Sequence, residues 1–240
     1  DGSVYVGGEF TAVNGQARPG LARLTSAHAL DTGWAPQDSP SYGSIVTALA
    51  VQDDGKVFVA RASFAGGTIP SVPSTAVLRR LNTDGTRDES FNSDISLTSS
   101  PSNTRIYSLA PDGAGGVVIG GQFSSVSGTA RGGFARIDGT GALDTSFGGG
   151  ANSNVFTVTR LADGRYLIGG QFGQVNGTLR TRIAILSSTG ALDDTFVPPS
   201  TGTTNGNVYA ATVLSDGRIV AGGNFTTFTG QATFGLVRFT

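Results

Sequence analysis

The sequence lacks cysteine altogether, which excludes disulfide bonds and metal sites built on thiolates. It holds a single histidine, His28, which excludes a His-rich metal centre and weakens any mechanism based on histidine. Aspartates recur in doublets such as Asp53-Asp54 and Asp193-Asp194, yet no D-x-D-x-D-G loop of the calcium-binding type is present. We therefore expect neither a metal site nor a cofactor.

Charge is also scarce. Charged residues make up 14% of the chain, and 16 basic side chains nearly cancel 17 acidic ones. No basic stripe exists to neutralise phosphates, which argues against nucleic acid as a partner. No apolar run reaches the ~18–20 residues that span a bilayer, so we expect no direct membrane insertion. The chain begins with Asp1-Gly2, contains no methionine and shows no signal peptide, which leads us to expect a processed or partial product.

What the chain has in abundance is glycine, at 37 residues, and much of it lies in a repeated phrase. The phrase reads LIGGQFGQVNGTLR at 167–180 and VIGGQFSSVSGTAR at 118–131. An Asp-Gly pair precedes each copy, and these pairs begin at residues 1, 54, 112, 163 and 216. The intervals of 53, 58, 51 and 53 residues indicate five copies of one structural unit.

Each copy reads as short β-strands, and no stretch shows helical periodicity. The expected first strands, at 45–52, 105–111, 154–161 and 207–214, are rich in β-branched and aromatic residues. An Asp-Gly hairpin turn follows, then a second strand, a polar loop, a third strand and a short piece with the pattern L-D-x-x-F. About four short strands in every ~50 residues are typical of a β-propeller blade.

The combined pattern, DG-(strand)-GG-x-F-x5-G-x2-R-(strand)-G-x-L-D-x-[ST]-F, resembles the bacterial delta-60 repeat over essentially the whole chain. The resemblance implies a β-propeller in a large secreted or surface-attached protein, with no general catalytic assignment. We predict an all-β fold with one β-propeller domain over 1–240, built of five blades of about four antiparallel strands. The predicted repeats are about 1–44, 45–104, 105–153, 154–206 and 207–240. The alternative is a truncated part of a larger propeller, because copy one lacks an inner strand and copy five lacks its L-D-x-x-F piece.

Most repeated residues have a structural interpretation. Paired glycines such as Gly120-Gly121 would permit a bulge or the close approach of a neighbouring backbone, whereas a phosphate-binding loop would need a following helix. The aromatic residues are expected to pack between blades. The Asp of L-D-x-x-F is interpreted as a local turn cap. An ion pair with a third-strand arginine is the alternative, but Ile185 stands where the other copies have arginine.

The candidate binding residues are few. Arg18, Arg131 and Arg180 lie in the longest polar loop of their repeats, where an arginine fork could hold carboxylates or sugar acids. The alternative is a strut that bonds to loop carbonyls or to the next blade. Trp34 could serve as a sugar-stacking platform, although sister copies carry Phe at that position and favour core packing. Tyr42 completes the set of candidate ligand-binding or partner-binding residues.

These observations lead to a functional expectation. We expect an extracellular, cell-surface or periplasmic module that acts as a scaffold, adhesion or protein-interaction unit. The alternative is a lectin-like, carbohydrate-binding propeller. The expected partners are a protein or a glycan at the blade-edge loops, and the chain would be a subunit or fragment of a larger assembly. The acids are spread one per repeat, whereas glycan hydrolysis needs two that converge, so the sequence predicts no enzyme.

Overall fold

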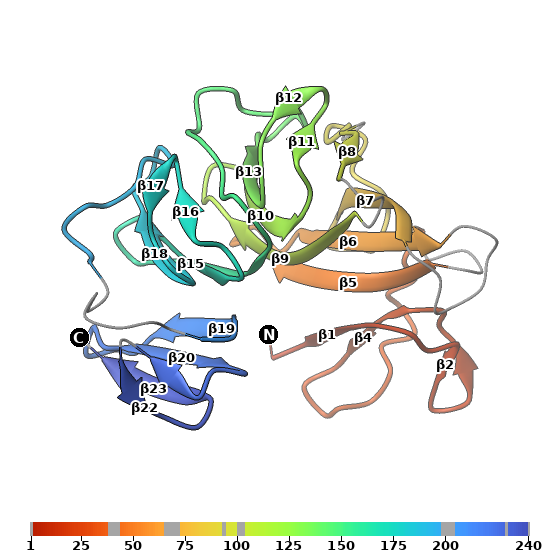
Figure 1. Ribbon diagram of the computed structural model, residues 1–240. Helices are drawn as coiled ribbons and strands as arrows, with labels where there is room; N and C mark the ends of the chain where they lie inside the picture. Colours follow the sequence, from red (N-terminus) through yellow and green to blue (C-terminus); the bar gives the residue numbers. More distant parts are fainter. Residues whose placement is uncertain are drawn as a thin grey trace.

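The fold is all-β, as seen in a computed structural model that describes residues 2–37, 44–64, 73–92, 95–99, 104–197, 205–228 and 230–239 (Figure 1). Within these ranges there is no helix, and the strands form small antiparallel sheets. The prediction of an all-β propeller is confirmed. The predicted strands formed because β-branched and aromatic residues fit a pleated, half-buried surface, and because the Asp-Gly turns supply glycines with positive φ, such as Gly55 at 83°.

Five principal sheets follow one another along the chain, and we call them blades 1 to 5. Blade 1 pairs β1 (Val4–Gly7) with β4 (Leu21–Leu24). Blade 2 contains β5 (Ser44–Val51), β6 (Val57–Phe64) and β7 (Pro73–Leu81). Blade 3 contains β9 (Arg105–Pro111), β10 (Val117–Gln122) and β13 (Phe134–Ile137). Blade 4 contains β14 (Val155–Arg160), β15 (Tyr166–Gly170) and β18 (Ile183–Leu186). Blade 5 contains β19 (Val208–Val213), β20 (Ile219–Gly223) and β23 (Leu236–Phe239).

The polar loop of each described repeat folds into a small hairpin at the outer edge of its blade. These hairpins are β2 (Ala12–Val13) with β3 (Gln16–Ala17), β11 (Ser125–Val126) with β12 (Thr129–Ala130), β16 (Gln174–Val175) with β17 (Thr178–Leu179), and β21 (Thr227–Phe228) with β22 (Gln231–Ala232). A further short strand, β8 (Leu97–Thr98), joins β11.

The L-D-x-x-F piece is shorter as a strand than expected. It contributes one bridge to the third strand of its blade, between Leu24 and Leu30, Leu81 and Arg87, Ile137 and Leu143, or Leu186 and Leu192. The chain then leaves the sheet in a turn, because the Asp that follows uses its carboxylate to bind the backbone and side chain two residues on, as Asp144 does with Ser146.

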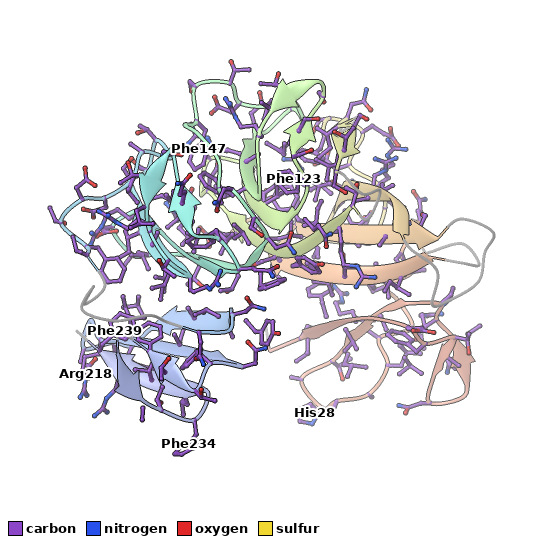
Figure 2. The ribbon with its side chains drawn as sticks, viewed as in Figure 1. His28, Phe123, Phe147, Arg218, Phe234 and Phe239 are labelled. Atoms are coloured by element: carbon purple, nitrogen blue, oxygen red, sulfur yellow. The ribbon has the colours of Figure 1, made fainter. Side chains whose placement is uncertain are left out.

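The core lies between neighbouring blades. Phe147 is fully buried between blades 3 and 4, with its ring edge-on to Phe134 at 6.3 Å and to Tyr166 at 5.9 Å. Trp34 occupies the same position between blades 1 and 2 and packs edge-on to Tyr5. The expectation that the aromatics pack between blades is confirmed for Trp34, Phe91 and Phe147, whereas Phe10 belongs to none of the core clusters. Phe234, in contrast to these buried rings, projects from blade 5 (Figure 2) and is 94% exposed.

The paired glycines serve the close approach that the sequence analysis predicted. At the first glycine of a pair, a Cβ on Gly120 would lie 2.6 Å from Val158 Cγ2 of the next blade. At the second glycine, a Cβ on Gly121 would collide with the carbonyl oxygen of Arg105, and the register of β9 and β10 shifts at this point. Only glycine leaves room both for the side chain of the next blade and for the bulge.

The Asp of L-D-x-x-F is more than a turn cap, because it also forms an ion pair. One oxygen of Asp144 caps Ser146 while the other accepts Arg136 Nε at 2.7 Å. In blade 4, where Ile185 replaces that arginine, Arg165 Nη1 reaches Asp193 at 2.6 Å from the turn before β15. Blade 4 thus retains the ion pair, but its arginine comes from a different position in the repeat.

Candidate functional site

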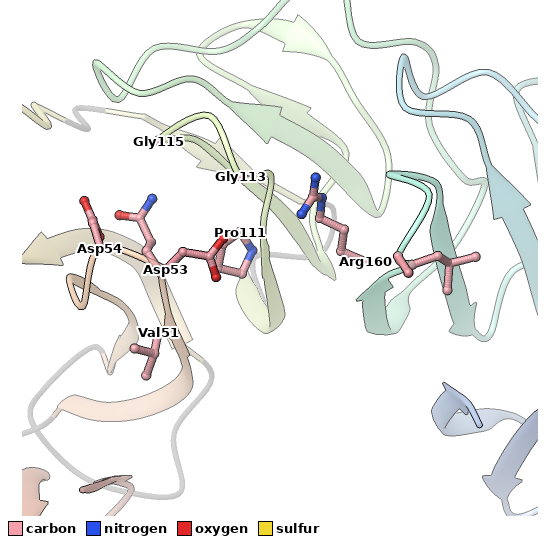
Figure 3. A pocket seen from close by; sticks show the side chains of 10 residues that line it. Val51, Asp53, Asp54, Pro111, Gly113, Gly115 and Arg160 are labelled. Carbon is pink, nitrogen blue, oxygen red and sulfur yellow. The ribbon is translucent and has the colours of Figure 1, made fainter. Parts of the chain in front are cut away.

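The first strands of blades 2, 3 and 4 end at one mouth of the propeller, and a hollow of about 420 Å³ opens among them (Figure 3). Strand β9 lies between β5 and β14, so the segments after these three strands come together. Blade 2 contributes residues 51–54, blade 3 contributes Pro111, Gly113 and Gly115, and blade 4 contributes residues 160–162. Hairpin turns therefore build this hollow, with rigid strands beneath each of them.

The walls of the hollow carry opposite charges. In Figure 3, Asp53 and Asp54 lie on one side and Arg160 lies on the other. Val51 and Pro111 add apolar surface to the lining. An arrangement of carboxylates, a guanidinium and short apolar surfaces can hold a small molecule that carries several hydroxyl groups, because each hydroxyl both donates and accepts.

Gln52 is the least expected member of the lining. Its side chain is 8% exposed, and its Oε1 is buried without a hydrogen-bond partner among the described residues. A buried acceptor without a donor costs about 1–3 kcal/mol, so such groups are rare unless something else supplies the donor. The turn itself is well formed, since Gln52 N donates to Lys56 O and Gln52 O accepts from Gly55 N. The backbone groups of Gln52 are therefore paired, and only its side-chain oxygen lacks a partner among the described residues.

Arg160 is held over the turn of blade 3. A Cβ on Gly113 would lie 3.0 Å from Arg160 Nη2, so glycine at this position leaves space for the guanidinium. The hydroxyl of Tyr166 also interacts with Arg160. Burial raises the pKa of Tyr166, so this hydroxyl is neutral beside the guanidinium.

A second hollow, of about 520 Å³, lies on the other side of the segment 160–162. It is formed between blades 4 and 5 and is lined by Arg165, Leu214 and Ser215 among others. Arg160 lines both hollows, so the two depressions are adjacent.

The three loop arginines are not brought to this mouth. Arg18, Arg131 and Arg180 each donate to the carbonyl of the preceding residue at the outer hairpins. Arg131 also reaches Thr145 O at 3.0 Å, and Arg180 reaches Asp194 Oδ1 at 3.0 Å. Both contacts tie the hairpin to the L-D-x-x-F turn of the same blade. The Nε of all three arginines is buried without a hydrogen-bond partner in the described part of the chain.

The remaining candidates lie elsewhere. Trp34 is fully buried between blades 1 and 2, with the Arg23 guanidinium 5.7 Å from its ring centre. Tyr42 lies outside the described residues. Sequence reasoning missed Gln52 and Arg160 as site residues. The available signal was that each lies within three residues of an Asp-Gly pair, and that Gln52 stands beside the acidic doublet Asp53-Asp54.

The described residues contain no group of three or more His, Asp or Glu side chains that could hold a metal ion. In the same ranges, no helix has the length and apolarity that a membrane span requires.

Comparison with known proteins gives one family match. The model of a β-propeller domain of unknown function (DUF5122) matches residues 1–33, 52–91, 115–147, 161–196 and 214–240. Each of these segments lies within one of the five repeats expected from the sequence. No curated protein matches the chain significantly.

Several solved structures share the fold. The extracellular domain of a putative one component system from B. thetaiotaomicron is 15% identical, with a TM-score of 0.53, and is matched over 99% of this chain and 26% of its own. A gluconolactonase from Xanthomonas campestris is 17% identical, with a TM-score of 0.52, over 86% of this chain and 62% of its own. A luciferin-regenerating enzyme is 12% identical, with a TM-score of 0.50, over 89% of this chain and 68% of its own. The chain spans less than two thirds of the first two proteins, and at these identities the likeness concerns the fold alone.

These structures correct one expectation. The sequence predicted no enzyme, because its acids are spread one per repeat. That prediction is wrong, because it took a propeller of repeated blades to argue against an enzyme. Solved structures with a similar fold include a gluconolactonase and a luciferin-regenerating enzyme. In this chain the end of one first strand carries two adjacent acids, Asp53 and Asp54, and the fold sets Arg160 across from them.

Proposed function

Because the chain belongs to the DUF5122 β-propeller family, whose repeats match it in five places, we propose that it is a ligand-binding propeller domain. Its ligand is a small hydroxyl-rich molecule of the carbohydrate class, which binds in the hollow between the turns of blades 2, 3 and 4. The domain is lectin-like in this sense. The observation that carries the proposal is the hollow itself, which has the carboxylates of Asp53 and Asp54 on one side and Arg160 on the other.

The chemistry of the lining favours hydroxyl groups over other ligands. The Asp53 and Asp54 carboxylates accept hydrogen bonds, and Arg160 only donates them. A sugar hydroxyl can donate to the first two groups while another accepts from the third. A purely anionic ligand would be repelled by Asp53 and Asp54, and a purely cationic one by Arg160.

The test is a glycan array followed by titration calorimetry with the best sugar, on the wild type and on Arg160→Ala and Asp53→Ala. Each variant is expected to weaken binding about ten-fold or more, because it removes a hydrogen bond that ligand binding completes. The matched control is Arg218→Ala. This arginine also follows an Asp-Gly turn and pairs with Asp216, but it lies outside both hollows. The melting temperatures should remain close to that of the wild type.

The outer hairpins offer a second surface, suited to scaffold or adhesion contacts with a protein or glycan partner. Leu179 on β17 is 71% exposed and stands next to Arg180, whose guanidinium is tied to Asp194. The same titrations on Leu179→Ser and Arg131→Ala decide between the two surfaces. If these hairpin variants lose sugar binding while Arg160→Ala keeps it, the site lies at the blade edges and the hollow is not the binding site.

We further propose an extracellular or periplasmic location. The sequence resemblance supports it, as does the similar fold of an extracellular domain from B. thetaiotaomicron.

A further inference from the structure

Neighbouring blades join in a repeated way. At three of the interfaces, a glycine in the second strand of one blade receives a branched side chain from the first strand of the next. The pairs are Gly7 with Val46, Gly120 with Val158 and Gly169 with Val208, where a glycine Cβ would lie 2.5, 2.6 and 2.7 Å from the valine methyl. We call this position the glycine seat.

Blade 5 carries the same seat, but no residue of the described ranges fills it. Gly222 on β20 is the equivalent glycine, and the nearest atom to a Cβ there is the carbonyl oxygen of Gly235 at 3.8 Å, in the same blade. Leu236 on β23 lies on the same side and is 66% exposed. Its equivalents in the other four blades, Leu21, Leu78, Phe134 and Ile183, are all fully buried by the following blade. The far face of blade 5 therefore has the features of an inter-blade interface, but no described blade packs against it.

An arginine gives a second, independent sign. In blades 1 to 3 the third-strand arginine crosses to a backbone carbonyl of the next blade. These bonds run from Arg23 to Thr83 O at 3.1 Å, from Arg80 to Gly115 O at 2.7 Å and from Arg136 to Ser188 O at 3.1 Å. Arg238 holds this position in blade 5, and it makes no such bond to another described residue.

The other end of the chain is open as well. Val4 on β1 is 46% exposed, whereas its equivalents Val57, Val117, Tyr166 and Ile219 are buried against the preceding blade. Strand β1 pairs with β4 alone, so among the described strands its inner edge lacks the first-strand neighbour that β6, β10, β15 and β20 have. Figure 1 shows the five sheets along an arc with blades 1 and 5 at its two ends.

We propose that one further blade of the same repeat type docks between the far face of blade 5 and the near face of blade 1. The seat at Gly222 needs a branched side chain on a first strand, and a blade of this type supplies one. Direct contact between blades 5 and 1 cannot supply this side chain, because blade 1 has no first strand. It consists of β1 and β4, which occupy the positions of a second and a third strand. A second copy of this chain presents the same two-stranded blade 1, so it leaves the seat empty for the same reason.

The test uses the full chain with and without added sequence. In the long form, a copy of residues 139–213 follows Thr240, which supplies one blade and a further first strand able to pair with β1. In the short form, a copy of residues 139–160 supplies only a turn and one first strand. The long form is expected to raise Tm by about 10 °C or more, because it covers both open faces. The short form is expected to leave Tm near that of the original chain.

A substitution at the seat gives the second measurement. Gly222→Val should leave Tm nearly unchanged in the original chain, since nothing opposes the new side chain, and should lower Tm clearly in the long form, where it fills the seat. Gly169→Val is the matched control and should lower Tm in both forms, because Val208 already occupies that seat.

Three results would overturn the proposal. If the short form gains as much stability as the long one, the ring closes with five blades. If light scattering shows the original chain to be a dimer that Gly222→Val dissociates, a second copy covers the face. If neither extension changes Tm and Gly222→Val is tolerated throughout, the face is not an interface.

Discussion

At the scale of single residues, the recurring aspartate combines two tasks that sequence reasoning treated as alternatives. One carboxylate oxygen caps its own turn and the other binds a cation. The cation comes from the third strand in Asp31, Asp88 and Asp144 but from the second-strand turn in Asp193. In the sequence, the arginine therefore fails to track the aspartate at a fixed spacing, although the ion pair is kept in space.

The pH dependence of stability follows from these aspartates. Burial disfavours the charged form of Asp144, but hydrogen bonds from Ser146 and Arg136 outweigh it and lower the pKa to about 2. The hydrogen bonds from Thr195 and Arg165 lower the pKa of Asp193 to about 2 as well. A carboxylate with a lowered pKa contributes stability above the unfolded-state pKa of about 4, and this contribution is lost as the pH falls through the folded-state value.

We therefore expect the free energy of unfolding to be level near neutral pH and to fall between about pH 5 and pH 2, by roughly 1–2 kcal/mol for each of the two groups. Urea unfolding followed by circular dichroism across this range measures the change. Asp193→Asn should lower stability at pH 7 and flatten the curve. A wild-type curve that stays level down to pH 2, or an Asp193→Asn curve as steep as the wild type, would contradict this account.

At the scale of the elements, each blade depends on its turns as much as on its strands. The short L-D-x-x-F piece makes one bridge and then leaves the sheet. Blades 2 to 5 therefore consist of three full strands with a capped turn beside them. The outer hairpins stand apart from these sheets and are tied back by Arg131 and Arg180. The turns that follow third strands also pack on a neighbouring blade, as Gly190 of blade 4 does on Phe147 of blade 3.

This packing predicts a difference between two turn glycines. Both Gly177 (φ 78°) and Gly190 (φ 81°) have a left-handed backbone, so alanine at either position costs about 1–2 kcal/mol in strain. A Cβ on Gly177 meets nothing within 4 Å, whereas one on Gly190 would lie 2.8 Å from Phe147 Cδ1 and from Gly148 N. Gly190→Ala should therefore cost about 1–3 kcal/mol more than Gly177→Ala, measured by urea unfolding. Equal losses would show that the backbone strain common to both turns sets the cost, and that the contact of Gly190 with Phe147 adds nothing.

At the scale of the whole molecule, the blades are not equally protected. Blade 3 has a neighbour on each face, since Phe134 packs on blade 4 and Ile119 on blade 2. Blades 1 and 5 each leave one face open, as the exposure of Val4 and Leu236 indicates. Stability should therefore be highest in the middle of the arc and lowest at its ends.

Native-state hydrogen exchange followed by mass spectrometry tests this gradient. Peptides that cover β10 should exchange at least about ten-fold more slowly than peptides that cover β1 or β20, because opening blade 3 breaks two interfaces and opening an end blade breaks one. Strand β15, which also lies in a blade with two neighbours, should behave like β10. Uniform exchange across all five blades would mean that the arc unfolds as a single unit.

The sequence by itself determined the repeat and the kind of element in each part of it. The Asp-Gly turns, the β-branched runs and the spaced aromatics are local signals, and each of them acts in the same way wherever the chain carries it. Arg131 and Arg180 stood out for the same reason, since repetition makes residues visible whether they bind a partner or brace a loop.

Only the tertiary structure decided what meets at the mouth of the propeller and which faces stay open. Gln52 and Asp53 belong to one repeat and Arg160 to another, at a different position of the pattern, so no fixed spacing along the chain connects them. They come together because first strands from separate blades end at the same side of the arc. The open seat at Gly222 is invisible in sequence for a related reason: the glycine is identical to its counterparts, and only its missing neighbour distinguishes it.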